Sequence, residues 1–277
     1  MSLELPRTLS PSKVAAFKDC ALAFRFSAID RLPEPPSVAA TRGSLVHAAL
    51  EGLFALEAPE RTLEAAMASL ARAAVAIRSD PEFVGLELTG EEEAAFLAEA
   101  AVLVRRYFEL EDPTAVHAIG VELMLTAELG PLKLRGIIDR LDLRADGELV
   151  VTDYKTGRAP SLRHEQSRLA GVHFYALLCE ELLGRRPALV QLLYLGDPVI
   201  MSTAPDEQST RGLRRRVGAL WSAVELACER EDFRPKPGPL CAWCAFQAYC
   251  PAFGGDPAAA RAAVADPKVA DPKEVAA

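Results

Sequence analysis

The sequence contains no long apolar run and no targeting segment. No stretch of its 277 residues approaches the ~20 consecutive apolar residues that a helix needs to span a bilayer. The first residues, MSLELPRTLSPSK, lack the basic start and apolar centre of a signal peptide. We therefore expect a cytoplasmic protein with no membrane partner, long enough to bury a sizeable core.

The chain also lacks an excess of positive charge and a nucleotide-binding loop. Its formal net charge of −8 argues against a protein coated by nucleic acid, although a local basic groove remains compatible with it. A basic cluster is formed by Arg211, Arg214, Arg215 and Arg216. A solvated helix face explains this cluster as well as a phosphate-binding surface does. No segment matches G-x4-G-K-[ST], so any ATP-driven movement would need a separate helicase subunit.

The predicted elements change in kind after Pro113. Before it, Ser10 and Pro11 predict the start of a first helix, and Thr41 or Ser44 is the expected cap of a second. Residues 57–112 are rich in Ala, Leu and Glu and predict further helices. After it, strand-like segments such as LKLRGIIDRLDLR and ELVVTDYKTG are followed by alternating helices and strands. The repetitive residues 256–277 are expected to be disordered.

Two opposite charges end the apolar strand predicted in VVTDYKTG. Asp153 and Lys155 are two residues apart, so they share one face of the strand. A turn centred on Asp146 would pair this strand with the preceding one and place Asp139 opposite Asp153. A slip of one residue would separate the two carboxylates.

Two neighbouring buried carboxylates repel each other unless a cation lies between them. Carboxylate oxygens suit Mg²⁺ or Mn²⁺, and a lysine beside them can stabilise a phosphate or act on an attacking water. The pattern therefore predicts phosphodiester hydrolysis. The alternative is a surface ion pair between Asp153 and Lys155 with Asp139 in solvent, and the apolar flanks of both strands count against it.

The segment GIIDRLDLRADGELVVTDYKTG closely resembles the motif of RecB-type nucleases in the PD-(D/E)XK superfamily. In that family one strand carries an aspartate and the next carries Asp-x-Lys followed by Thr-Gly. The resemblance implies that Asp139 and Asp153 bind the metal and take part in catalysis, with Lys155 as the catalytic lysine. Ile138 stands where the superfamily has its proline. The implied fold is α/β, with a restriction-endonuclease-like core in which helices flank a mixed central sheet.

Two further segments are similar to the same family. RGSLVHAALE resembles the motif of its upstream helix, which implies that His47 is a metal ligand alongside the carbonyl oxygen of Tyr154. The family also has a helix with Gln-x-x-x-Tyr. Tyr175 matches the tyrosine here, but Gly171 stands where the glutamine is expected. The residues considered for contact with DNA are Tyr175, Arg140 and Arg158.

Six cysteines are present, and three of them are closely spaced as Cys241-x2-Cys244-x5-Cys250. In a reducing cytoplasm this spacing favours metal or cluster ligation over disulfides. Zinc and iron–sulfur clusters commonly take four thiolates, so a fourth is needed. Cys179 and Cys228 lie in amphipathic helices at positions that suit a small buried hydrophobe, whereas Cys20 ends the first helix.

This spacing resembles the iron–sulfur staple of AddB-type and CRISPR-associated RecB-like exonucleases. The resemblance implies a [4Fe-4S] cluster held by Cys20, Cys241, Cys244 and Cys250, with zinc as the rival occupant. The cluster would join the N- and C-terminal parts of one nuclease domain over residues 1–255, with a helical insertion at about residues 57–112.

Together these resemblances imply a metal-dependent DNA nuclease, an exonuclease that acts on single-stranded DNA or duplex ends, with DNA and a helicase, repair or CRISPR subunit as partners. The alternative is a catalytically decayed iron–sulfur subunit of a repair or CRISPR complex that only binds DNA. The missing glutamine and the acidic net charge favour the alternative, and Asp139, Asp153 and Lys155 oppose it.

Overall fold

The computed structural model describes residues 3–160 and 162–260 and divides the chain into two compact units. The first unit comprises Met1–Pro35, Glu128–Leu134 and Arg214–Ala277, so it contains both ends of the chain. The second comprises Pro36–Ala127 and Arg135–Leu213. Among the described helices, none combines the length and the apolar character that crossing a bilayer requires.

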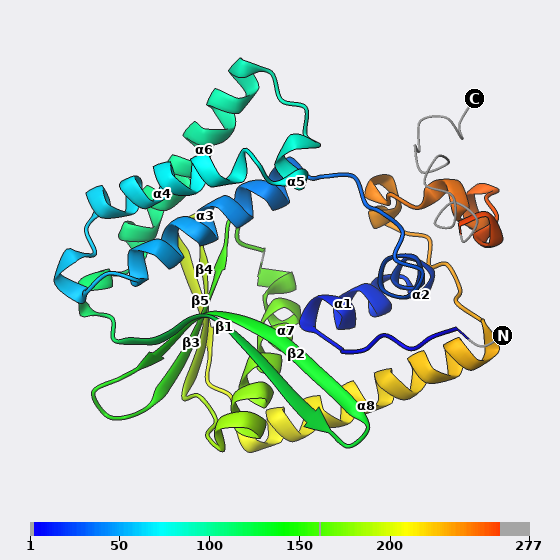
Figure 1. Cartoon of the computed structure of the whole chain (residues 1–277). Coiled ribbons are helices and arrows are strands. Elements are labelled where there is room, and N and C mark those ends of the chain that lie inside the picture. The colour runs from blue at the N-terminus through cyan, green and yellow to red at the C-terminus, as the bar shows by residue number, and fades with distance from the viewer. Residues whose placement is uncertain (1–2, 161, 261–277) are drawn as a thin grey trace. The chain divides into compact units, whose positions relative to one another are not determined.

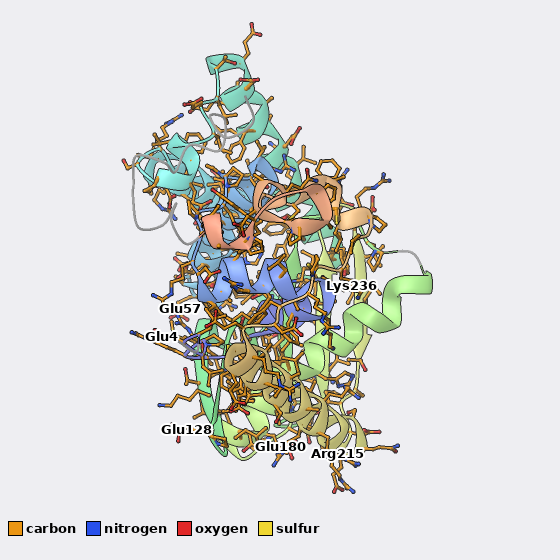
Figure 2. All side chains as sticks on the ribbon, turned by 90° about the vertical axis from the view of Figure 1, so that its right-hand side faces the viewer. Glu4, Glu57, Glu128, Glu180, Arg215 and Lys236 are labelled. Carbon is orange, nitrogen blue, oxygen red and sulfur yellow. The ribbon has the colours of Figure 1, made fainter. Side chains whose placement is uncertain are left out.

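The first unit contains several short helices. They are α1 (Pro11–Asp19), α2 (Ala21–Phe24), the π-helix η1 (Arg25–Ile29) and three 3-10 helices, η4 (Pro239–Trp243), η5 (Gln247–Tyr249) and η6 (Pro251–Phe253). As predicted, Ser10 caps α1 by accepting a hydrogen bond from the Lys13 N–H. The unit also contains the greater part of α8 (Glu207–Arg230), from which the exposed side chain of Arg215 projects (Figure 2).

The helices of the second unit are mostly longer. They are α3 (Val38–Phe54), η2 (Ala58–Glu60), α4 (Leu63–Ile77), α5 (Pro81–Val84), α6 (Gly90–Leu110), η3 (Pro113–Ala115) and α7 (Leu162–Leu183). The predicted cap of α3 was wrong. Ser37 caps it by accepting the Ala40 N–H, so the helix begins earlier, and Thr41 and Ser44 lie inside it.

Five strands form one mixed sheet in the order β1-β2-β3-β4-β5. They are β1 (Ala118–Leu129), β2 (Leu132–Leu143), β3 (Leu149–Lys155), β4 (Leu189–Tyr194) and β5 (Val199–Thr203). β2 pairs antiparallel with β3, β3 parallel with β4, and β4 antiparallel with β5. Arg140 pairs with Thr152, which is the predicted register of the hairpin. The predicted α/β class, a mixed sheet flanked by helices, is confirmed.

Helices cover both faces of this sheet. α3, α4 and α6 run beside one another and share a hydrophobic core with Tyr154 of β3 (Figure 1). The neighbouring residue Asp153 instead contacts Tyr175 of α7. Successive residues of a strand point to opposite faces, so α7 lies on the face opposite α3 and α6. The face that carries Asp153 therefore meets α7.

The predicted disordered tail begins with residues that the structure describes. Asp256 accepts the Ala258 N–H at 2.9 Å through its side chain, and Ala260 is fully buried. Asp256 thus caps a helical turn at residues 257–260, and the disorder of the tail stays a prediction. The rest of the predicted tail, residues 261–277, lies outside the described residues.

Candidate active site

His47 of α3 meets groups from three strands. Its Nδ1 lies 3.5 Å from Asp139 Oδ1 on β2 and 3.7 Å from Glu122 Oε1 on β1. Its Nε2 lies 3.2 Å from the carbonyl oxygen of Tyr154 on β3. His47, Glu122 and Asp139 each offer a ligand atom, and these atoms all lie within 4.8 Å of one another. Among the described residues, no other group of three or more His, Cys, Asp or Glu side chains has its ligand atoms this close together.

The donors and their spacing suit a small hard cation. Adjacent ligands of an octahedral ion bound at about 2.1 Å lie about 3 Å apart, close to the separations around His47. Two carboxylates and an imidazole are donors that Mg²⁺ and Mn²⁺ accept, and here both carboxylates face the same ring nitrogen, Nδ1. The residues present therefore fit a small divalent cation such as Mg²⁺ or Mn²⁺.

The charge of the site also favours a cation. Burial lowers the pKa of His47, but hydrogen bonds to Asp139 and Glu122, together with the charges of Asp139 and Asp153, raise it to about 10. The imidazole thus carries a proton at neutral pH because negative charge surrounds it. A divalent cation bound here would take over the role of that proton.

Asp139 is held in place by the neighbouring strand. Its Oδ2 accepts the Tyr154 backbone N–H at 2.6 Å, and the residue is buried. Its other oxygen faces His47. The carboxylate is therefore fixed between the backbone of β3 and the helix that carries His47.

Asp153 and Lys155 form a separate pair on the same face. Asp153 Oδ2 makes an ion pair with Lys155 Nζ, and Asp153 Oδ1 accepts a hydrogen bond from the Tyr175 hydroxyl at 3.1 Å. Burial raises the pKa of Asp153, opposed by the charge of Lys155. Burial lowers the pKa of Lys155, but the charge and hydrogen bond of Asp153, together with the charge of Asp139, raise the pKa overall. The lysine is therefore an ammonium ion aimed by a buried carboxylate, and its side chain is still 44% exposed.

The structure thus divides the predicted metal set. Asp139 faces His47 Nδ1, whereas the Tyr154 carbonyl faces Nε2, and the metal contacts of all three groups stay predictions. Asp153 does not belong to the group of ligand atoms around His47 and is engaged by Lys155 and Tyr175 instead. Its metal contact stays a prediction.

Glu122, which was not predicted from the sequence, is the third member of the group formed with His47 and Asp139. This residue lies on β1 with a φ of 45°, in the left-handed region that side chains other than glycine rarely adopt. A local departure from strand geometry decides where its side chain points, and the sequence does not encode this departure visibly. The available signal was a single acid within the apolar run GVELML.

Replacing Glu122 by glutamine should weaken Mn²⁺ binding by about 10- to 100-fold, a range typical for groups around a metal. The change removes one negative charge from the group around His47 and replaces one carboxylate oxygen by an amide NH2. Isothermal titration with Mn²⁺ measures the effect. Glu128→Gln, on the same strand but with its carboxylate exposed and paired with Lys133, is the matched control and should bind like the wild type. Equal affinities for all three proteins would exclude Glu122 from the site.

Arg140, one of the residues expected to contact DNA, is buried. The residue is 0% exposed, and its guanidinium is paired with Glu111 and Asp142 inside the second unit. It follows Asp139 on β2, and its guanidinium reaches Tyr107 of α6, away from the face that carries Asp153. The prediction that Arg140 contacts DNA was therefore wrong.

Arg158 and Tyr175 are placed differently. Arg158 follows β3, its side chain is 87% exposed, and its Nε lies 3.3 Å from Asp197 Oδ2. The hydroxyl of Tyr175 contacts Asp153, and a Cβ at Gly171 would meet open space within 4 Å. Contacts of Arg158 and Tyr175 with DNA stay predictions.

Gly196 fixes the loop that follows Lys155. A Cβ added at Gly196 would lie 2.4 Å from the carbonyl oxygen of Gly157. We expect Gly196→Ala to lower the free energy of unfolding by about 1–3 kcal/mol, because the backbone must shift to relieve the overlap. Urea denaturation measures this loss. Gly157→Ala in the same loop has no neighbour within 4 Å and should change stability little. A loss of equal size in both variants would contradict the close approach.

Five of the six cysteines lie in the first unit, and four of these five line one cavity. A cavity of about 250 Å³ is lined by Cys20, Cys241, Cys244 and Cys250. The pKa of Cys244 is raised by burial and by the charges of the other three thiols. The backbone N–H of Lys236, which is labelled in Figure 2, donates to the Cys20 sulfur at 3.4 Å. The backbone N–H of Gly238 donates to the Cys241 sulfur at 3.4 Å. Cys179 and Cys228 are buried, as predicted.

The sulfurs of this cavity are not tightly clustered. The described residues include no three thiols whose sulfurs all lie within 4.8 Å of one another. Tetrahedral zinc, bound at about 2.3 Å, would require sulfurs about 3.8 Å apart. The thiols thus surround one cavity at a wider spacing than a single zinc ion needs.

The sequence matches a known protein family. A sequence model described as the PD-(D/E)XK nuclease superfamily matches residues 8–251. The chain belongs to this superfamily, whose members use divalent metals. The membership agrees with the mixed sheet and with the acidic site around His47.

Individual relatives are more distant. The chain is 32% identical to the Gene 69 protein of Mycobacterium phage L5 over 136 aligned residues. The alignment covers 48% of this chain and 44% of the phage protein. The chain therefore matches less than half the length of this relative. A crystal structure of a candidate exonuclease from Eubacterium rectale aligns with a TM-score of 0.57 and 15% identity, over 86% of this chain and 87% of that one. This likeness supports the fold.

Proposed function

We propose that the protein is a divalent-metal-dependent deoxyribonuclease. One observation carries the proposal: an imidazole and two carboxylates converge within 4.8 Å, on a PD-(D/E)XK sheet that also places Lys155 on the face of Asp153. His47, Glu122 and Asp139 would hold Mg²⁺ or Mn²⁺, with the Tyr154 carbonyl as a further ligand.

The residues of the site have separate tasks in this proposal. A bound divalent cation supplies Lewis-acid activation of a phosphate oxygen and an acidified water. The Lys155 ammonium donates a hydrogen bond to the phosphate as negative charge develops there. Asp153 and Tyr175 hold Lys155 on this face, and Tyr154 holds Asp139. Arg158, exposed beyond β3, would bind the DNA backbone with an affinity that falls with salt.

We further propose exonuclease action on single-stranded DNA or duplex ends. The support is the motif resemblance and the fold shared with the candidate exonuclease from Eubacterium rectale. Processive action on duplex DNA would need a separate helicase subunit, which a repair or CRISPR complex would supply.

A degradation assay with Mn²⁺ or Mg²⁺ tests both parts of this function. End-labelled linear single-stranded DNA should be degraded, circular single-stranded DNA of the same sequence should persist, and EDTA should stop the reaction. Absence of degradation with either metal would refute the nuclease. Cleavage of the circle at the rate of the linear strand would refute exonuclease action alone.

For the cysteines we propose a [4Fe-4S] cluster held by Cys20, Cys241, Cys244 and Cys250. The support is their shared cavity, its two backbone N–H donors, and a sulfur spacing wider than zinc needs. Protein purified without oxygen should contain about four irons per chain and absorb in the visible range. Cys244→Ser should lose the iron, whereas Cys228→Ser, a buried thiol outside the cavity, should keep it. One zinc and no iron per chain would contradict the cluster.

The second candidate is a DNA-binding subunit without catalysis. It is favoured by Asp153, which lies outside the group of ligand atoms around His47, and by Gly171 in place of glutamine. In the same assay this candidate predicts retention of labelled DNA on the protein without degradation.

A further inference from the structure

A buried arginine, Arg140, follows the proposed ligand Asp139 on β2. Arg140 is the largest of the fully buried side chains, and its guanidinium stacks 4.5 Å from the centre of the Phe54 ring. It donates to both oxygens of Asp142, at 2.8 and 3.0 Å, and to both oxygens of Glu111. Its remaining hydrogen bonds reach the hydroxyls of Tyr154 at 3.0 Å, Thr152 at 3.2 Å and Tyr107 at 3.3 Å.

Such a cluster costs free energy to bury. Removing a guanidinium and two carboxylates from water is expensive, and apolar residues of similar volume are often at least as stabilising. The buried ion group is therefore weak support for stability alone. Its fixed geometry, with a planar fork bound on both sides, suits the precise placement of its partners.

Tyr154 connects this cluster to the site. Its hydroxyl accepts from Arg140 on one face of β3, while its backbone N–H donates to Asp139 at 2.6 Å. Its carbonyl oxygen lies 3.2 Å from His47 Nε2, and its ring meets the His47 ring edge-on at 5.9 Å. One residue thus contacts both the arginine cluster and two of the proposed metal ligands.

We propose that Arg140 is a positioning residue for the cation site and acts through Tyr154. By holding the Tyr154 hydroxyl, Arg140 sets the place of the backbone N–H that orients Asp139 and of the carbonyl that faces His47. The inference rests on the proposed function, since it concerns the same cation site. Arg140 itself touches neither the cation nor DNA.

Two hydroxyl deletions in the same cluster test this role. Tyr154→Phe removes the hydrogen bond between Arg140 and the Tyr154 hydroxyl and leaves the one from Arg140 to Thr152 in place. Tyr107→Phe removes a hydroxyl that also contacts Arg140 and, at 2.7 Å, Glu111, but Tyr107 lies on α6 and has no backbone group at the site. Both residues are buried, so both variants should lose some thermal stability. A purely structural role predicts equal consequences for both.

The measurement is the Kd for Mn²⁺ of the full-length chain by calorimetric titration, with a melting curve for each variant. Tyr154→Phe should weaken Mn²⁺ binding by about tenfold, the lower end of what groups behind metal ligands contribute. Tyr107→Phe should stay within about twofold of the wild type at a similar or lower melting temperature. Equal Kd values in the two variants, changed or unchanged, would overturn the positioning role.

A parallel DNA assay on the wild type separates this inference from the proposed function. If the wild type degrades DNA and Tyr154→Phe binds Mn²⁺ normally, the positioning role falls and the nuclease stands. If the wild type binds Mn²⁺ but leaves DNA intact, a selective loss in Tyr154→Phe still supports the positioning role. A wild type that binds no Mn²⁺ would overturn both.

Discussion

Replacing Lys155 by methionine should lower the rate of DNA hydrolysis by a factor of about 10²–10⁴, the range found when a positioned acid or electrostatic donor is removed from an active site. The reason lies in the ion pair with Asp153, which directs the ammonium to the face where the acids converge. Methionine keeps most of the aliphatic stem but removes the charge. Single-turnover degradation of end-labelled DNA in Mn²⁺ measures the rate.

Binding and folding should survive this change. Filter binding of DNA should be nearly unchanged, because the lysine is needed for the developing charge and the rest of the surface still binds the backbone. Lys133→Met, at an exposed lysine paired with Glu128, is the matched control and should retain full activity. A Lys155→Met protein that folds and degrades DNA within about threefold of the wild-type rate would remove Lys155 from the mechanism.

Replacing Asp139 by asparagine should weaken Mn²⁺ binding by about 100-fold or more and abolish measurable hydrolysis. The amide oxygen can still accept the Tyr154 N–H, so the local hydrogen bond is retained while the negative charge beside His47 is lost. The two ligands that remain in the group are His47 and Glu122. Calorimetric titration with Mn²⁺ and the degradation assay give the two readouts.

The control for Asp139 comes from the same hairpin. Asp146 lies in its exposed turn, where Oδ1 accepts the Glu148 N–H at 3.0 Å, and asparagine can keep that bond. Asp146→Asn should bind Mn²⁺ and degrade DNA like the wild type. If Asp139→Asn retained Mn²⁺ affinity while folded, Asp139 would not be a ligand.

The sequence predicts the β2–β3 hairpin well because local rules determine it. The turn at Asp146 and the two apolar strands fix the register, and Arg140 pairs with Thr152 as expected. The α/β class followed from the resemblance of the same segment to a known family. Ser10 was also identifiable as a cap, since its role depends only on residues three positions away.

Other parts of the site depend on contacts between distant residues. Glu122 lies beside His47 at a residue of β1 with a positive φ, and no local pattern in the sequence indicates this backbone conformation. Arg140 was predicted to contact DNA because it lies next to the candidate active-site residue Asp139. Its position next to Asp139 on a strand should have placed it on the other face, and its partner Glu111 lies 29 positions earlier.

The cysteine cavity could be predicted from the sequence only in part. The spacing of Cys241, Cys244 and Cys250 indicated ligation, but spacing cannot select a fourth thiol from a distant part of the chain. The structure places Cys20 in the cavity because the first unit combines both ends of the chain, with the Lys236 N–H donating to the Cys20 sulfur.

The most direct test of the central claim is a crystal structure of the protein soaked in Mn²⁺, with data collected for the anomalous signal of manganese. We predict one strong peak bound by Asp139, Glu122 and the His47 imidazole, at about 2.1–2.2 Å from their ligand atoms. A fully soaked crystal with no peak at these three side chains, or with its strongest peak elsewhere, would contradict the account.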